Sequence, residues 1–175
     1  FQEALALACD TPENPDYEFR YDPAHYPANN VYQLRGNSIV FKKHLYPQIH
    51  DLQYLTEHGK VTEEYRCAEA LENCPWVKRW VRNIEKNPYS FRLPLSVRFF
   101  YPDFVAELTD GRILVVEYKG ADRESTDDSR EKNHVGHVWE AHSHGRGVFL
   151  FGLLKDDQGR NIAQQIEDAV QGRAH

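Results

Sequence analysis

The stretch from Tyr101 to Gly120 constrains this chain most, because two apolar-rich runs in it flank the dipeptide Asp110-Gly111. An Asp-Gly pair between such runs is among the strongest short-range signals of a β-hairpin. Successive side chains on a strand point to opposite faces. If the hairpin aligns the matching faces of its two strands, Asp103 lies on the same side as Glu117 and Lys119. We therefore expect these three charged groups to converge near the strand ends opposite the turn.

Both strands of this hairpin are rich in apolar residues, which indicates that they are buried. A buried charged residue is usually paired or bound to a metal ion. Two carboxylates suit Mg²⁺, which takes oxygen ligands and keeps several waters, and an ammonium group can neutralise a phosphate or position a water molecule. The same spacing also allows a surface hairpin with a ladder of Glu and Lys side chains. Spacing alone therefore leaves both interpretations open.

Pro102-Asp103, the hairpin and Glu117-Tyr118-Lys119 together resemble the signature of the PD-(D/E)xK nuclease superfamily. The closest likeness is to the C-terminal endonuclease domain of type III restriction-enzyme-like helicase subunits, since residues 41–47, 77–83 and 91–95 also resemble segments of those domains. The resemblance implies Mg²⁺-dependent cleavage of nucleic acid, with Mn²⁺ able to substitute. It also implies that the metal ligands are Asp103, Glu117 and the backbone carbonyl of Tyr118. Lys119 would then orient or activate the attacking water.

Residues Thr62 to Asn73 have the pattern of a helix, with Thr62 as N-cap and glutamates in the first turn. Glu64 interrupts an otherwise apolar face of that helix. A first-turn glutamate can simply serve the helix dipole. In many PD-(D/E)xK nucleases a helix glutamate lies beside the metal, so the resemblance implies that Glu64 completes the site or holds a second metal ion. Glu69 is a less favoured substitute because it lies off that face.

Residues 76–83 alternate as a strand, which predicts Lys78, Trp80 and Arg82 on one side and Val77, Arg79 and Val81 on the other. Arginine can bind a phosphate through two hydrogen bonds, and tryptophan can stack on bases. Arg82 and Lys78 are therefore candidate contacts to nucleic acid. Arg82 could equally pair with a carboxylate.

Two further basic features are candidate contacts to phosphate. Arg130 to His142 has helical spacing, with Asp127 or Asp128 as the expected N-cap, and Lys132 lies on its patterned face. The resemblance implies that Lys132 points toward the active site, whereas a surface lysine is the plain alternative. The cluster at residues 42–44 could contact phosphates or lie in a solvated loop.

The continuous apolar run at residues 147–154 predicts a central strand buried on both faces, and residues 161–171 predict a final helix. The resulting class is α/β, and the resemblance implies a restriction-endonuclease-like core, a mixed central sheet flanked by helices in the order αβββαβ. We expect an N-terminal extension over residues 1–60, with loops and a β-hairpin near residues 31–41, and a nuclease domain over residues 61–175.

Composition limits the partners that this chain can have. The 175 residues are long enough for a sizeable core and contain no run of about 20 apolar residues, so no membrane segment is expected. The three cysteines form no CxxC pair, which favours a reducing cytoplasm. A net charge of −6 is unusual for a free-standing nucleic-acid binder. Residue 1 is Phe and the chain has no methionine, so we expect a piece of a longer protein with an upstream helicase or ATPase region.

The sequence therefore predicts a Mg²⁺-dependent endonuclease domain acting on DNA, and double-strand cleavage would require dimerisation or sequential nicking. The alternative is a non-catalytic nucleic-acid-binding or interaction module of a larger helicase-like protein. A third interpretation is a protein-interaction domain that uses the aromatic N-terminal segment. His134 and His137 are one helical turn apart and could bind a transition metal, but no familiar ligand spacing completes that set.

Overall fold

The computed structural model describes residues 17–31, 40–120 and 127–172. Its longer elements are a four-stranded sheet and three α-helices, and a 3₁₀ turn and a two-stranded sheet accompany them. In chain order the elements are η1 (Pro23–His25), α2 (Glu63–Asn73), β1 (Val77–Arg82), β2 (Leu93–Pro94), β3 (Phe99–Phe100), β4 (Phe104–Leu108), β5 (Ile113–Lys119), α3 (Asp127–His142), β6 (Gly147–Leu153) and α4 (Ile162–Gln171).

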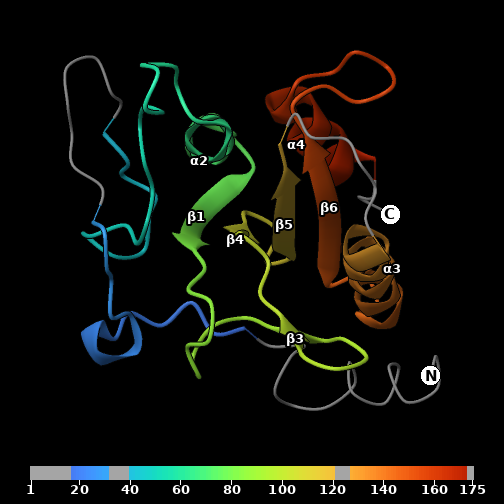
Figure 1. Ribbon diagram of the computed structural model, residues 1–175. Helices are drawn as coiled ribbons and strands as arrows, with labels where there is room; N and C mark the ends of the chain where they lie inside the picture. Colours follow the sequence, from blue (N-terminus) through green and yellow to red (C-terminus); the bar gives the residue numbers. More distant parts are fainter. Residues whose placement is uncertain (1–16, 32–39, 121–126, 173–175) are drawn as a thin grey trace.

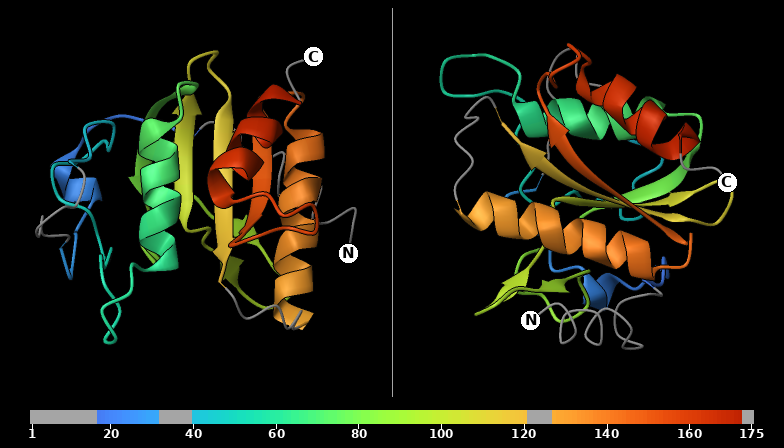
Figure 2. Two further views of the ribbon diagram at one scale, coloured as in Figure 1. Left: turned by 90° about the horizontal axis from the view of Figure 1, so that it is seen from above. Right: turned by 90° about the vertical axis from the view of Figure 1, so that its right-hand side faces the viewer.

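The central sheet has the order β1-β4-β5-β6 (Figure 1). The β1–β4 and β4–β5 pairs are antiparallel, whereas β5 and β6 are parallel. Helices α2 and α4 cover one face of the sheet and α3 covers the other (Figure 2, right). The predicted class, α/β with a mixed central sheet between helices, is confirmed.

The hairpin of β4 and β5 has the register that the sequence predicts. Gly111 adopts a φ of 89° in the turn and donates its N–H to the Leu108 carbonyl. Val105 and Val115 are directly opposite each other and pack on the α3 side. The alternate residues, among them Ala106 and Leu114, pack on the side of α2 and α4. Residues from the two faces thus enter two separate hydrophobic clusters.

Strand β1 departs from simple alternation. The register with β4 shifts between Val77 and Arg79, which marks Lys78 as the extra residue of a β-bulge. As a result Val77 packs in the same cluster as Trp80 and not on the opposite side. The predicted sharing of one face by Lys78 and Arg82 is therefore wrong, because the bulge breaks the period between them.

Residues 40–46 lie along the outer edge of β1 (Figure 1). Trp80 donates its backbone N–H to the Lys43 carbonyl and accepts from the Leu45 N–H at 2.9 Å, so this stretch pairs beside β1. An unpaired sheet edge is a liability, and this contact removes it. The hairpin expected near residues 31–41 falls largely on residues 32–39, outside the described residues, and the boundary at residue 60 stays a prediction.

Helices α2 and α4 begin at capping residues. Thr62 caps α2 by accepting the Tyr65 N–H at 3.2 Å, and Asn161 forms a capping box with Gln164 at the start of α4. Helix α3 starts earlier than predicted, because Asp127 and Asp128 form its first turn.

Strand β6 is the last strand in the order of its sheet and is not central as predicted. Its apolar run is explained by α3 and α4, which pack on its two faces. Within the described residues, no helix is both long enough and apolar enough to cross a membrane.

Candidate active site

Asp103 lies directly before β4 and is held from two sides. Its Oδ1 accepts from Arg82 Nη1 at 2.7 Å, and its Oδ2 accepts from the backbone N–H of Tyr118 at 2.8 Å. Its own carbonyl accepts from Arg82 Nη1 and from the Asn83 N–H. These contacts from β1 and β5 fix the carboxylate at the end of the sheet.

Pro102 explains why the ladder between β4 and β5 stops at this point. Phe104 pairs with Val116, so the same register places position 102 opposite Tyr118. In an antiparallel ladder, residues in such a pair exchange two hydrogen bonds, but proline has no N–H to donate. The Tyr118 N–H is taken by the Asp103 side chain. The Tyr118 carbonyl has no ladder donor at position 102, which fits its predicted role as a metal ligand.

Glu117 is the second carboxyl of the site, and its side chain is only 13% exposed. Lys132 Nζ lies 3.1 Å from Glu117 Oε1. Burial, followed by the charge of Asp103, raises the pKa of the Glu117 carboxyl well above its ordinary value, although Lys132 acts in the opposite direction. The site therefore contains two carboxyl groups that repel each other and one ammonium that offsets part of their charge.

Arg82 connects Asp103 to the third predicted carboxylate. Arg82 Nη2 donates to Glu64 Oε2 at 3.0 Å, and the guanidinium lies over the Phe104 ring. Burial is the main cause that raises the pKa of Glu64, and Arg82 offsets part of the effect. Of the two roles that the sequence leaves open for Arg82, the structure shows carboxylate pairing, and contact with nucleic acid stays a prediction.

The lysines are arranged differently from the simplest expectation. Lys119 Nζ donates to Ser129 Oγ at 3.1 Å, so its ammonium reaches the start of α3. Lys132 forms the ion pair with Glu117 and also lies 3.6 Å from Asp128. Lys132 is thus at the site, as predicted.

Lys78 is not part of this constellation. It forms an ion pair with Glu107 at 2.9 Å, and Arg79 binds the same carboxylate. Both lie at the opposite end of β1 from Arg82. The structure places Lys78 away from Asp103, Glu117 and Glu64, and its contact with nucleic acid stays a prediction.

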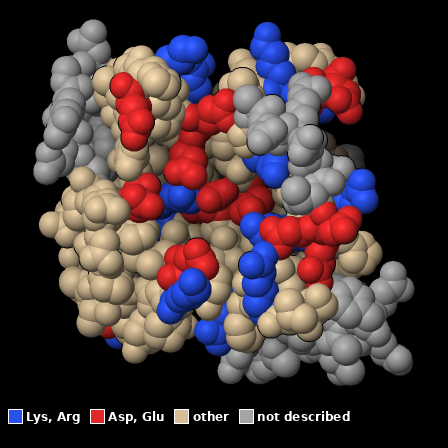
Figure 3. All heavy atoms as spheres, in the orientation of Figure 1, with Lys and Arg blue, Asp and Glu red and all other residues tan. Residues whose placement is uncertain are grey.

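The site opens on one face of the molecule, where Asp and Glu side chains gather in a central band with Lys and Arg atoms within and around it (Figure 3). A groove of about 380 Å³ adjoins the site and is lined by Glu64, Tyr118 and Gly120, among others. Glu63 reaches into the same region, since its Oε2 would lie 2.6 Å from a Cβ at Gly120. The space beside the end of β5 is accessible and acidic.

The donor set fits a hard divalent cation. Asp103 and Glu117 offer carboxylate oxygens, and a cation between them would relieve the repulsion that raises the Glu117 pKa. No group of three His, Cys, Asp or Glu side chains within the described residues is arranged as a metal cluster. A site of this composition would therefore depend on the Tyr118 carbonyl and on water for its other ligands, as Mg²⁺ sites commonly do.

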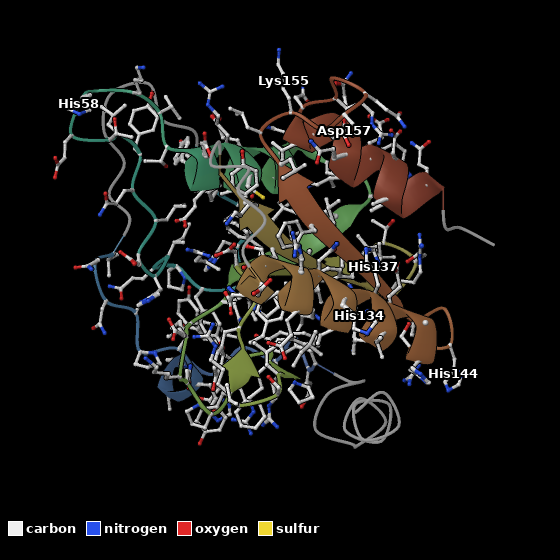
Figure 4. The ribbon with its side chains drawn as sticks, turned by 45° about the vertical axis from the view of Figure 1, so that its right-hand side comes forward. His58, His134, His137, His144, Lys155 and Asp157 are labelled. Carbon is white, nitrogen blue, oxygen red and sulfur yellow. The ribbon has the colours of Figure 1, made fainter. Side chains whose placement is uncertain are left out.

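The histidines among the described residues do not form a competing metal site. His134, His137 and His144 are spread along α3 and just beyond its end, and their side chains do not converge (Figure 4). His137 instead lies 3.2 Å from Glu140 of the same helix.

Three supporting residues could not be assigned from sequence patterns. Ser129 receives the Lys119 ammonium, His44 accepts the Arg82 N–H at 3.1 Å, and Tyr26 donates its hydroxyl to the Arg82 carbonyl at 2.8 Å. His44 belongs to the basic cluster considered for phosphate contact, but it is buried, and burial lowers its pKa to about 4. It is therefore a neutral hydrogen-bonding group at neutral pH.

Comparison with family models, with curated proteins and with solved structures gives no match. The candidate site therefore rests on the geometry of its own residues.

Proposed function

We propose that this chain is a Mg²⁺-dependent endonuclease domain that hydrolyses phosphodiester bonds of DNA. The observation that carries the proposal is the meeting of Asp103 and Glu117 at the strand ends opposite the turn. The Tyr118 carbonyl directly follows Glu117 in sequence and has no ladder donor at Pro102. The order of α2, β1, β4, β5, α3 and β6 supports a restriction-endonuclease-like core.

The proposed reaction is in-line attack of water on a phosphodiester. Mg²⁺ bound by Asp103, Glu117 and the Tyr118 carbonyl would act as a Lewis acid and lower the pKa of a bound water. Lys119 would orient the attacking water, for which its ammonium must leave Ser129. Lys132, already within 3.1 Å of Glu117, would stabilise negative charge on the phosphate as it develops.

The acidic balance of the chain favours a place within a larger protein. With a net charge of −6, most of the grip on DNA would come from another region, such as an upstream helicase or ATPase. Double-strand cleavage would require dimerisation, which provides two such sites, or sequential nicking by one site.

A non-catalytic interaction or nucleic-acid-binding module is the second candidate. Two contacts favour it, because Asp103 Oδ1 is bound to Arg82 and the Lys119 ammonium is turned toward Ser129. A site locked in this arrangement would retain the fold without the reaction.

Cleavage of plasmid, linear duplex and single-stranded DNA with Mg²⁺, Mn²⁺ and Ca²⁺ separates the two candidates. The nuclease requires Mg²⁺ or Mn²⁺, fails with Ca²⁺, and loses about 10²-fold or more in rate in Asp103→Asn, Glu117→Gln and Lys119→Met. Lys78→Met is the matched control, because Lys78 forms its ion pair at the other end of β1. DNA binding without cleavage, unchanged by these substitutions, would establish the module instead.

A further inference from the structure

Arg82 occupies the position between two of the three carboxylates predicted to bind metal. Its Nη1 lies 2.7 Å from Asp103 Oδ1 and its Nη2 lies 3.0 Å from Glu64 Oε2. One planar cation thus contacts an oxygen of each group. Arg82 thus already supplies the positive charge that a divalent ion shared by Glu64 and Asp103 would bring.

The guanidinium is fixed in this position. The residue is only 9% exposed, and its guanidinium lies 4.9 Å from the centre of the Phe104 ring. Its backbone is bound on both sides, since Arg82 N donates to His44 Nε2 and Arg82 O accepts from the Tyr26 hydroxyl. Arg82 also belongs to β1, whose neighbours hold the strand in register.

The third nitrogen of the guanidinium, Nε, fits a position that is set by the two carboxylates. Arg82 Nε is buried and has no hydrogen-bond partner among the described residues. A buried donor without a partner costs free energy, so the side chain gives up one hydrogen bond to remain between Asp103 and Glu64. This is the arrangement expected of a counter-ion built into the site.

We infer that Arg82 is the fixed cation of this site and takes the place of a second metal ion. The site then binds one divalent ion, at Asp103 and Glu117, and Glu64 serves Arg82 and not the metal. Arg82 is a positioning residue, because it holds the Asp103 carboxylate in place. The inference rests on the proposed function, and it replaces the predicted metal role of Glu64.

Counting bound ions tests this without turnover. Mn²⁺ titration followed by electron paramagnetic resonance of free Mn²⁺, with calorimetry for Mg²⁺, gives the number of ions per chain. We expect one ion for the native protein and two for Arg82→Met, in which Glu64 and Asp103 are released. The double variant Glu64→Gln/Arg82→Met returns to one ion.

Glu64→Gln supplies a second measurement that does not depend on the folding of Arg82→Met. Its Mn²⁺ dissociation constant should stay within a factor of about five of the native value, because the half-exposed Glu64 acts only through its charge. Glu69→Gln is the matched control on the same helix. The melting temperature of Arg82→Met should also rise more with Mn²⁺ than that of the native protein, which a purely structural role would not produce.

The outcomes separate this inference from the proposed function. Two ions in the native protein, or a loss of more than about tenfold in affinity for Glu64→Gln, would overturn the role of Arg82 while leaving the nuclease in place. One ion without cleavage would retain the role of Arg82 and reject the nuclease. No bound ion at all would overturn both.

Discussion

Glu117 is the residue whose protonation should be most affected by its surroundings in the site. Burial and the nearby Asp103 raise its pKa, so the folded state keeps a proton that the unfolded state releases. For an acid of this kind, stability falls as pH rises from the ordinary pKa of 4.5 through the raised value. In the metal-free protein, Glu117 should therefore lower the free energy of unfolding at neutral pH but not at pH 4.

Glu117→Gln should remove this cost. In chelator, the variant should gain stability relative to the native protein as pH rises from about 5 to 8, by about 1–3 kcal/mol. Urea unfolding at intervals across this range measures the difference.

Glu107→Gln is a control of opposite sign. Burial alone would raise the pKa of Glu107, but the hydrogen bonds from Lys78 and Arg79 outweigh burial and lower that pKa. Its deficit should be present above the ordinary pKa and disappear as pH falls. A Glu117→Gln difference that is constant with pH would contradict this account.

The sequence predicts those features of the site that the alternation of side chains along a strand determines. Asp103 and Glu117 follow from alternation around a turn, and both lie where that pattern predicts. The ends of long side chains do not follow from the period, which is why Lys119 was expected at the carboxylates and Lys132 forms the ion pair. The pairing of Arg82 was one of two open alternatives, because only tertiary contacts decide it.

Among the elements, β1 depends on an N-terminal segment whose described part, residues 17–31, contains only the 3₁₀ turn η1. Tyr26 is the clearest link, since its hydroxyl donates to the Arg82 carbonyl at 2.8 Å and accepts the His50 N–H at 3.1 Å. The segment is rich in proline and has no periodicity, so sequence patterns could not predict this contact. They also could not predict the bulge at Lys78, which adds one residue without any change in the apolar pattern.

Tyr26→Phe should destabilise the protein by about 1–3 kcal/mol, because it leaves two backbone groups without their partner. Denaturant unfolding measures the loss. Tyr21→Phe is the matched control, as Tyr21 is 53% exposed. Equal losses in the two variants would show that the Tyr26 hydroxyl does not anchor β1.

Helix α3 packs closely against β6 because Gly136 has no side chain. A methyl group there would overlap the Phe149 ring, which is fully buried. Gly136→Ala should therefore destabilise the protein by about 1–3 kcal/mol through overpacking, even though alanine favours a helix over glycine by about 1 kcal/mol.

His134→Ala, on the exposed side of the same helix, supplies the comparison for Gly136→Ala, and its stability should be unchanged or slightly increased. Thermal unfolding of the two variants measures the contrast. Stabilisation by Gly136→Ala would mean that α3 can move away from β6 at no cost.

The same contact explains how β6 is buried although it is the last strand of its sheet. A continuous apolar run predicts cover on both faces of a strand, which α3 and α4 provide, but it does not predict the place of the strand in the sheet order.

The molecule as a whole is acidic, and its candidate site is acidic as well. A net charge of −6 opposes a polyanion at long range. The order of helices and strands could be predicted because each element has its own hydrophobic periodicity and is bounded by capping or turn residues. How such a chain would approach DNA could not be predicted, because the approach would depend on how its charges are distributed over the surface.

The proposed function makes DNA binding depend on the metal and little on salt. Each phosphate neutralised by a basic side chain adds about 0.9 to the slope of log affinity against log salt, so a chain with few basic contacts should show a slope of only about 1–3. Ca²⁺, which should not support cleavage, should tighten binding relative to chelator, because it offsets the charge of Asp103 and Glu117. Fluorescence anisotropy with a labelled duplex measures both quantities, and Asp103→Asn should lose most of the gain from Ca²⁺. A steep slope that is indifferent to Ca²⁺ would place the grip on DNA on a basic surface away from the carboxylates and would favour the non-catalytic module.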